Sequence, residues 1–425
     1  MLYFLERGFM KKEINFGIGF ITGRPNVCKI INNYYKFFVE QVSKLDYKVN
    51  FTIFILFDLS YLHTTRTDFY GILPEVYKNV TVKYITPEAI DEDKKKLISI
   101  FDFTKEEADL LIGKGYAKAR NTILYYALKR KVDYLLFWDD DEYPLASIKE
   151  GKELEWIKQN NIATHIENIS KADITYGYRC GMMNPVPYIQ YDENVTEEDY
   201  KHFIDGLENE VISWDRIQKT LKENRSISYA DREIAEGKAS SEVVKGIGKE
   251  NYVLGSGICL NLRHLDKIPA FYNPPGARGE DTFFSCALAE KNAKVLRVPT
   301  YHFHDSFLKY TGLMKDKFPK SLPRISLDDN GIEQRFLKTT IGWTKYKPLL
   351  YYITDNENYK SIIKQTRENL EVSIPKMNTI FQTCDFSCLL RELDDYDKNV
   401  KKHYKEYIRT TEVWDKLKQK IKEHK

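Results

Sequence analysis

The stretch 132–144 limits the fold of this chain more than any other. It begins with a mostly apolar run, 132–138, and then changes abruptly to Asp139, Asp140, Asp141 and Glu142 before Pro144. The run is too short for a globular helix and fits a strand that is buried on both faces of a sheet. Adjacent carboxylates repel one another, so a divalent cation such as Mg²⁺ or Mn²⁺ at the strand's carboxyl end would compensate their charge. A solvated acidic turn is the alternative, because acidic clusters are common in loops.

The residues before this stretch predict an open α/β sheet. Apolar runs at 14–22, 51–57 and 80–85 read as strands, and helical spacing of apolar residues over 30–45 predicts a helix between the first two. Ligands of such sheets bind at the carboxyl ends of the strands. The candidates there for contact with a nucleotide are Thr22, Gly23, Arg24 and Asp58. Ordinary loop chemistry remains the alternative for each of them.

A second predicted helix leads directly into the acidic strand. It begins around Ala119-Arg120-Asn121 and carries an apolar stripe from Ile123 to Leu128. The Arg120 guanidinium could face a diphosphate, since its fork matches phosphate oxygens. It could equally pair with one of the four acids. We expect a further helical segment after Pro144, extending to Ile169.

The order of these features resembles the core of the GT-A fold glycosyltransferases, and most closely the large inverting group that includes many bacterial polysaccharide synthases. Asp139-x-Asp141 matches their Asp-x-Asp motif, and the upstream Ala-Arg-Asn helix lies at the corresponding distance. The resemblance implies that Asp139 and Asp141 bind Mn²⁺ or Mg²⁺, which bridges the two phosphates of a nucleotide-sugar donor. It also implies that Asp139 and Asp140 contact the donor.

A pair of acids further along the chain is the candidate catalytic base. Glu280 and Asp281 follow Gly279 at the start of a predicted helix, where capping and the helix dipole favour acidic residues on local grounds alone. The resembled family has an acidic pair at this point, and one of its carboxylates deprotonates the acceptor hydroxyl. An inverting displacement requires such a base. We expect Asp281 to be the base, with Glu280 as the alternative.

Two histidines complete the candidate site. His302 and His304 follow a predicted strand at alternate positions, so their side chains should point the same way. GT-A enzymes often use one C-terminal histidine as a further metal ligand, which the resemblance assigns to His304 or, second, His302. Two surface histidines without a ligand role are the alternative.

The remaining sequence features predict the domain organisation, the compartment and the partners of the chain. The sequence predicts a GT-A domain over 11–310, with an insertion at about 191–249 near the acceptor cleft, and a mainly helical region over 311–425. Scattered cysteines suggest reduced thiols and a cytoplasmic protein. The net charge of +3 gives no reason to expect nucleic acid as a partner. The basic amphipathic segment 399–425 could contact an anionic membrane, where lipid-linked acceptors reside, but docking on its own domain is favoured.

The function expected from the sequence is sugar transfer from a UDP- or GDP-sugar to a hydroxyl of a glycan or lipid-linked acceptor, with inversion. A sugar-phosphate nucleotidyltransferase is one rival, but it should have a glycine-rich basic loop after the first strand, and only Gly23-Arg24 is present. A non-catalytic nucleotide- or carbohydrate-binding protein is a second rival. A metallohydrolase that uses Asp139, Asp141, His302 and His304 is a third.

Overall fold

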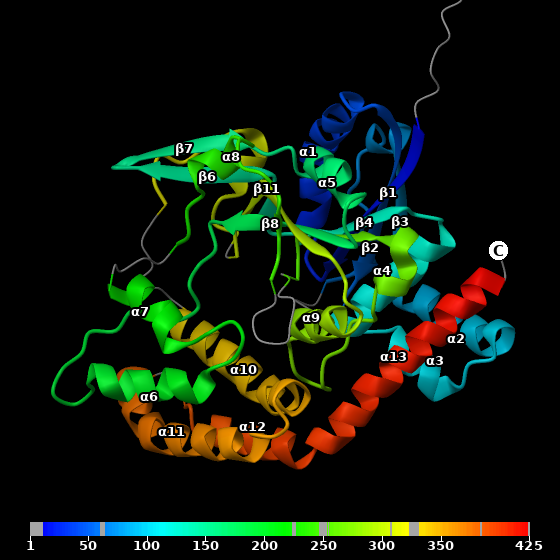
Figure 1. Cartoon of the computed structure of the whole chain (residues 1–425). Helices are drawn as coiled ribbons and strands as arrows, with labels where there is room; N and C mark the ends of the chain where they lie inside the picture. The colour runs from blue at the N-terminus through cyan, green and yellow to red at the C-terminus, as the bar shows by residue number, and fades with distance from the viewer. Residues whose placement is uncertain are drawn as a thin grey trace, which may run out of the picture.

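The structure is a computed structural model that describes residues 12–59, 64–222, 227–245, 253, 255–306, 308–322, 331–382 and 385–423. Its centre is a nine-stranded sheet with the order β3-β2-β1-β4-β10-β8-β11-β5, and β9 pairs with β11 (Figure 1). The strands are β1 (Lys12–Thr22), β2 (Tyr47–Phe57), β3 (Val80–Ile85), β4 (Tyr134–Phe137), β5 (Glu142–Tyr143), β8 (Ile174–Cys180), β9 (Glu242–Val243), β10 (Ile258–Asn261) and β11 (Val295–His304).

The direction of the strands confirms the fold class expected from the sequence. Strand β10 runs antiparallel to its neighbours β4 and β8, and β5 and β9 run antiparallel to β11. The remaining neighbours are parallel, so β1, β2, β3, β4, β8 and β11 all point the same way. The chain is therefore an α/β protein with a mixed, mostly parallel sheet.

Helices cover both faces of this sheet, which explains why its central strand β4 is apolar and buried along its whole length. Along β4, Leu136 packs on the face covered by α1 and α5, whereas Leu135 and Phe137 pack on the face covered by α4 and α9. The helices on the sheet side of the molecule are α1 (Asn26–Ser43), α2 (Pro87–Phe101), α3 (Lys105–Leu111), α4 (Tyr116–Lys129), α5 (Asn161–Ile169), α8 (Arg232–Ala235) and α9 (Glu280–Glu290), with short 3₁₀ turns at Arg66–Phe69, Val76–Lys78, Leu262–Lys267 and Thr311–Lys315.

The segment after Pro144 differs from its expectation. Residues Leu145–Glu150 and Glu153–Lys158 form an antiparallel hairpin, β6 and β7, and only Asn161–Ile169 is helical. Gly151 turns the hairpin with φ +58°, a conformation that glycine adopts without steric cost. In β7 the residues Glu153, Leu154, Glu155 and Trp156 alternate between polar and apolar, and that period of two is what the helical reading overlooked.

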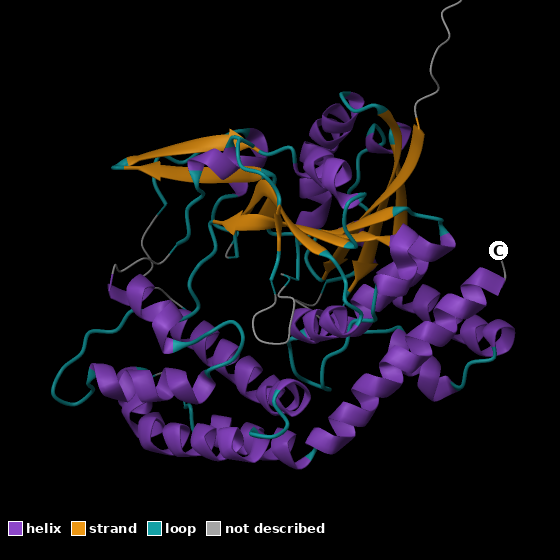
Figure 2. Ribbon diagram, in the orientation of Figure 1, coloured by secondary structure: helices purple, strands orange, loops and turns teal. Residues whose placement is uncertain are grey.

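A second layer of helices forms its own core away from the sheet (Figure 2). It contains α6 (Glu197–Leu207), α7 (Trp214–Lys222), α10 (Ile332–Thr354), α11 (Tyr359–Ile380) and α12 (Cys388–Lys398). The first half of the predicted insertion thus shares a core with the C-terminal region, and the fully buried Lys347 of α10 donates from Nζ to the Gly206 carbonyl of α6 at 2.9 Å. The second half returns to the sheet, where β9 pairs with β11. We call α6, α7 and α10–α12 the helical layer.

The C-terminal helix α13 (Val400–Glu423) runs from the helical layer back to the sheet side, beside α3 (Figure 1). Most of its apolar residues are buried, although Ile408 is exposed, and the indole nitrogen of Trp414 donates to the Ile268 carbonyl at 2.8 Å. Arg409 and Lys416 both pair with Glu107 of α3, at 2.6 and 2.9 Å. The segment therefore docks on its own chain, which the sequence analysis favoured over contact with a membrane. None of the helices in the described ranges is long and apolar enough to cross a membrane.

Five cysteines lie within the described residues, and all five are free thiols. Cys28, Cys180, Cys259 and Cys286 are buried, and Cys388 is half-buried. Cys384 lies outside the described residues.

Candidate functional site

The four acids lie where the chain leaves β4 and pairs with the end of β11. Strand β5 aligns Glu142 with His304, and the Asp305 backbone N–H donates to the Asp141 carbonyl at 2.8 Å. This pairing brings the acidic segment beside the two histidines, although the sequence separates them widely. Each acid then has its own set of neighbours.

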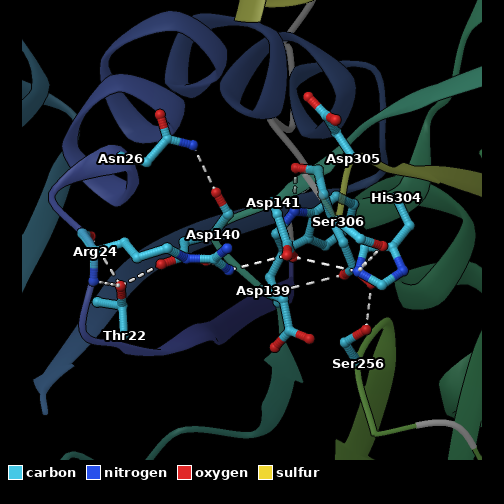
Figure 3. Close-up of polar contacts among 12 residues, drawn as sticks. Thr22, Arg24, Asn26, Asp139, Asp140, Asp141, Ser256, His304, Asp305 and Ser306 are labelled. Atoms are coloured by element: carbon cyan, nitrogen blue, oxygen red, sulfur yellow. Dashed lines mark hydrogen bonds and ion pairs between the residues drawn. The ribbon is translucent and has the colours of Figure 1, made fainter. Parts of the chain in front are cut away.

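Asp140 is bound by the end of β1. The Thr22 hydroxyl and the Arg24 guanidinium both donate to its carboxylate, and the Asn26 amide donates to its backbone carbonyl at 2.8 Å (Figure 3). Arg24 also reaches Asp141, at 2.9 Å. Burial raises the pKa of Asp140 even though Arg24 opposes that shift. Thr22 and Arg24 therefore join the first strand's end to the acidic segment.

Asp141 is the acid that faces His304. The His304 Nε2 atom lies 3.5 Å from the Asp141 carboxylate, and its Nδ1 atom is buried without a hydrogen-bond partner among the described residues. Burial alone would raise the pKa of Asp141, but the hydrogen bond and charge of His304, with Arg24, lower it. The same contact raises the pKa of His304 against the effect of burial.

His302 belongs to a different network, in which His302 and Glu142 are fully buried and Arg179 reaches the cavity. Its Nε2 atom lies 3.3 Å from Glu142, and Arg179 donates to it at 3.2 Å. Arg179 also donates to the Ser256 hydroxyl at 2.7 Å, and that hydroxyl donates to Glu142. Gly257 packs flat on the imidazole: a Cβ there would lie 2.3 Å from His302 Cε1, and φ is +63°. The side chain of His302 is 1% exposed, so it supports the site from behind.

Asp139 differs from the other three acids. No hydrogen bond or ion pair to its carboxylate comes from the part of the chain that the structure describes, and Figure 3 shows that carboxylate without a contact. Burial, followed by the charge of Glu142, raises its pKa to about 7, with Asp141 adding to the shift and Arg120 opposing it. A positive charge placed beside Asp139 would stabilise its ionised carboxylate and lower this pKa.

These residues fit a divalent cation in the kind of donor they offer. Asp139 and Asp141 supply carboxylate oxygens, and His304 supplies an imidazole nitrogen, a set suited to Mn²⁺ and within reach of Mg²⁺. Within the described ranges, however, no group of three or more His, Cys, Asp or Glu side chains already has a metal-binding arrangement. Arg24 occupies one side of Asp141, so a metal would require it to shift. The metal site stays a prediction.

The candidate base lies at the first turn of α9. Arg120 approaches Glu280 with Nε at 3.5 Å from Oε1, and its guanidinium packs over the rings of Phe137 and Phe271 at 5.1 and 5.6 Å. Arg120 therefore pairs with Glu280 and with none of the four acids. Burial, followed by the charge of Asp281, raises the pKa of Glu280.

A link to the helical layer holds this turn in place. The Thr282 hydroxyl donates to Glu210, which lies in the predicted insertion, and the Tyr346 hydroxyl of α10 donates to the same carboxylate oxygen at 3.3 Å. Three segments that are distant in the sequence thus meet beside the candidate base.

One cavity of about 1390 Å³ connects these groups. It lies between the carboxyl edge of the sheet and the helical layer. The sequence-predicted residues that line it are Thr22, Gly23, Arg24, Asp58, Arg120, Asp139, Asp140, Asp141, Glu280, Asp281 and His304. His302 is not among the lining residues. The sequence patterns did not point to Arg179, which lines the cavity beside Glu142, or to the opposite wall, which includes Arg216, Arg278, Arg335, Lys338 and Trp343.

The fold and the site define an α/β protein with an acidic strand end facing a large, covered cavity. Neither a protein-family model nor a curated protein matches this chain. Nineteen chains of known structure match. One is mouse xyloside xylosyltransferase 1 in its apo form, at 8% identity, covering 66% of this chain and 74% of that chain with a TM-score of 0.24. At that score the two backbones superpose too loosely to support an argument about function.

Proposed function

We propose that this chain is a metal-dependent glycosyltransferase, which moves a sugar from a nucleotide-sugar donor to a hydroxyl of a glycan or lipid-linked acceptor with inversion. The observation that carries the proposal is the convergence on one cavity of Asp139, Asp141 and His304 with the acidic pair Glu280 and Asp281. These residues come from separate elements, and each has a role in such a transfer.

The donor would lie against the carboxyl ends of β1, β2 and β4. Thr22, Gly23, Arg24 and Asp58 line that end of the cavity and would contact the nucleotide. Asp139, Asp141 and His304 would hold Mn²⁺ or Mg²⁺, which would neutralise the charge of the departing diphosphate. Arg24 would keep its contact with Asp140 as it yields Asp141.

The acceptor would enter from the side of α9. Its hydroxyl oxygen attacks the anomeric carbon and forms the new glycosidic bond, the bond from that carbon to the phosphate oxygen breaks, and the nucleoside diphosphate leaves. The hydroxyl proton passes to a carboxylate of the acidic pair. We assign this role to Asp281, because Glu280 is already paired with Arg120.

The rival readings fit the geometry less well. A hydrolase that used His302 and His304 together would need both at one metal, but His302 is bound to Glu142 and Arg179 behind the cavity. A nucleotidyltransferase would need a glycine-rich basic loop after β1, whereas that loop carries one arginine, already bound to Asp140. A non-catalytic binding protein would keep the fold without turnover, and the experiment below distinguishes it.

The test is nucleoside diphosphate release from UDP-, GDP-, CDP- and dTDP-sugars, measured with Mn²⁺, Mg²⁺ or EDTA. We expect release from one donor that EDTA abolishes and that Asp141→Asn lowers by at least about 100-fold, the loss typical for one group that stabilises charge in the transition state. The matched control is Asp266→Asn, whose carboxylate is 83% exposed and, within the described residues, forms an ion pair only with Lys422. Metal-dependent nucleotide binding with no release, with or without sugar acceptors, would favour the binding protein, and absence of both would contradict the proposed site.

A further inference from the structure

The wall of the cavity that faces the acids is basic. It is formed by one face of α10, on which Arg335, Lys338, Gly342 and Tyr346 recur at helical spacing. Arg335 lies close enough to Asp141 for the charge of that carboxylate to act on it, and Tyr346 lies at the other end beside Glu210. The face therefore runs along the cavity from the predicted metal site to the first turn of α9.

Arg278 lies across the middle of this face. A Cβ at Gly342 would be 3.6 Å from Arg278 Cδ, and the guanidinium packs over the ring of Tyr116 at 5.5 Å. Burial lowers the pKa of Arg335; Asp141 opposes this shift and the positive charge of Arg278 reinforces it. Like charges thus approach one another on this wall.

Two of these cations differ in their partners from three arginines elsewhere in the cavity. Arg24, Arg120 and Arg179 each have a carboxylate within ion-pair distance. Arg278 and Lys338 have none within 4.0 Å among the residues that the structure describes. Arginine and lysine gathered in a partly enclosed space attract anions, and charge-assisted bonds to phosphate or carboxylate oxygens are the strong ones.

We propose that Arg278 and Lys338 bind an anionic group, a phosphate or a carboxylate, that the acceptor carries near the hydroxyl to be glycosylated. This inference rests on the proposed function. The base must touch that hydroxyl, and Arg278 directly precedes Gly279 and the acidic pair. The donor's phosphates belong at the other end of the cavity, beside Asp141 and Arg24. The acceptor class is therefore a phosphorylated or uronic-acid glycan, or a sugar joined to a lipid phosphate.

The test compares neutral sugars with their anionic counterparts on the full chain. The probes are glucose with glucose 6-phosphate and glucuronate, and N-acetylglucosamine with its 6-phosphate. Binding is measured by calorimetry in the presence of nucleoside diphosphate and Mn²⁺, and transfer by acceptor-stimulated release of nucleoside diphosphate. We expect at least one anionic probe to bind about tenfold or more tightly than its neutral counterpart, with a preference that added salt weakens.

The double variant Arg278→Gln/Lys338→Gln should reduce that preference by roughly 10-fold to 100-fold, as expected for loss of one or two charge-assisted hydrogen bonds. The matched control is Lys364→Gln/Arg391→Gln, two cations on the exposed surfaces of α11 and α12, which should keep it.

Three outcomes would overturn the inference. The first is equal affinity for the neutral and anionic members of every pair. The second is an anionic preference that the double variant retains. The third is a higher donor KM in the double variant with the anionic preference unchanged. The last would assign the cations to the donor's diphosphate. Anion binding that depends on Arg278 and Lys338 in a protein that turns over no donor would sustain the site while defeating the proposed function.

Discussion

The two walls of the cavity differ in whether their charged side chains are paired with opposite charges. At the carboxyl edge of the sheet, Asp140, Asp141 and Glu142 are each bound by a basic side chain from another strand or loop. Among the described residues, Asp139 has no such partner. On the α10 wall, Arg278 and Lys338 have no carboxylate within reach in the described structure. Paired charges need a partner to move before a ligand can bind, as Arg24 would have to release Asp141 for a metal, whereas unpaired charges are available to a ligand directly.

This difference indicates which wall would bind the donor and which would recognise the acceptor. The acidic edge would hold the part of the reaction that all such transfers share, a metal and a diphosphate. The α10 wall would recognise what is particular to this chain's acceptor. The acidic pair at α9 lies between the two walls. Substitutions of this pair are therefore the strongest test of the comparison.

The largest expected effect is at that pair. Asp281→Asn should lower the rate of transfer to an acceptor by about 10²–10⁴-fold, because an amide cannot take the acceptor's proton. Glu280→Gln should cost less, since it removes the partner of Arg120 without removing the base. Steady-state transfer rates of both variants decide the order. A larger loss in Glu280→Gln would reverse the assignment of the base.

The next effect concerns the buried network behind the acidic edge. Gly257→Ala places a methyl group against His302 in a backbone conformation with φ +63°, and it should lower the free energy of unfolding by about 2–5 kcal/mol. Gly151→Ala is the matched control, because its φ is +58° but a Cβ there would meet nothing within 4 Å; the expected loss is about 1–2 kcal/mol. Urea unfolding of both variants measures the difference. Equal losses would mean that the contact with His302 contributes nothing.

A smaller effect is expected from the buried cation of the helical layer, Lys347, which differs in this respect from the cations of the cavity. Burial lowers the pKa of Lys347 to about 7, whereas the unfolded chain keeps a value of about 10.4. Between these values the unfolded state binds more protons, so the stability of the native protein should rise with pH by up to about 1.4 kcal/mol per unit. The difference in unfolding free energy between the native protein and Lys347→Met should rise with this slope from about pH 7 to 10. Below about pH 7 the difference should be constant. Parallel pH profiles of the two proteins would contradict it.

The sequence by itself determined the parts of this protein that local pattern controls. The apolar run 132–138 has to be a doubly buried strand, and acids that follow it at once must leave the sheet at its carboxyl end. The same logic placed β1, β2 and β3 and the helix that carries Arg120, and it predicted the α/β class that the strand directions then confirmed. The acidic pair could be located because a helix start has a recognisable composition.

Only the tertiary structure decided how these parts meet. His302 and His304 are equivalent by strand period, but the register of β5 on β11 gives Asp141 to His304 and Glu142 to His302. Register depends on pairing between distant segments, and a period of two cannot choose among alternate positions. The basic wall was hidden for a related reason: Arg278 and Lys338 look like ordinary surface residues until the packing of α6, α7 and α10–α12 in one core turns α10 toward the acids.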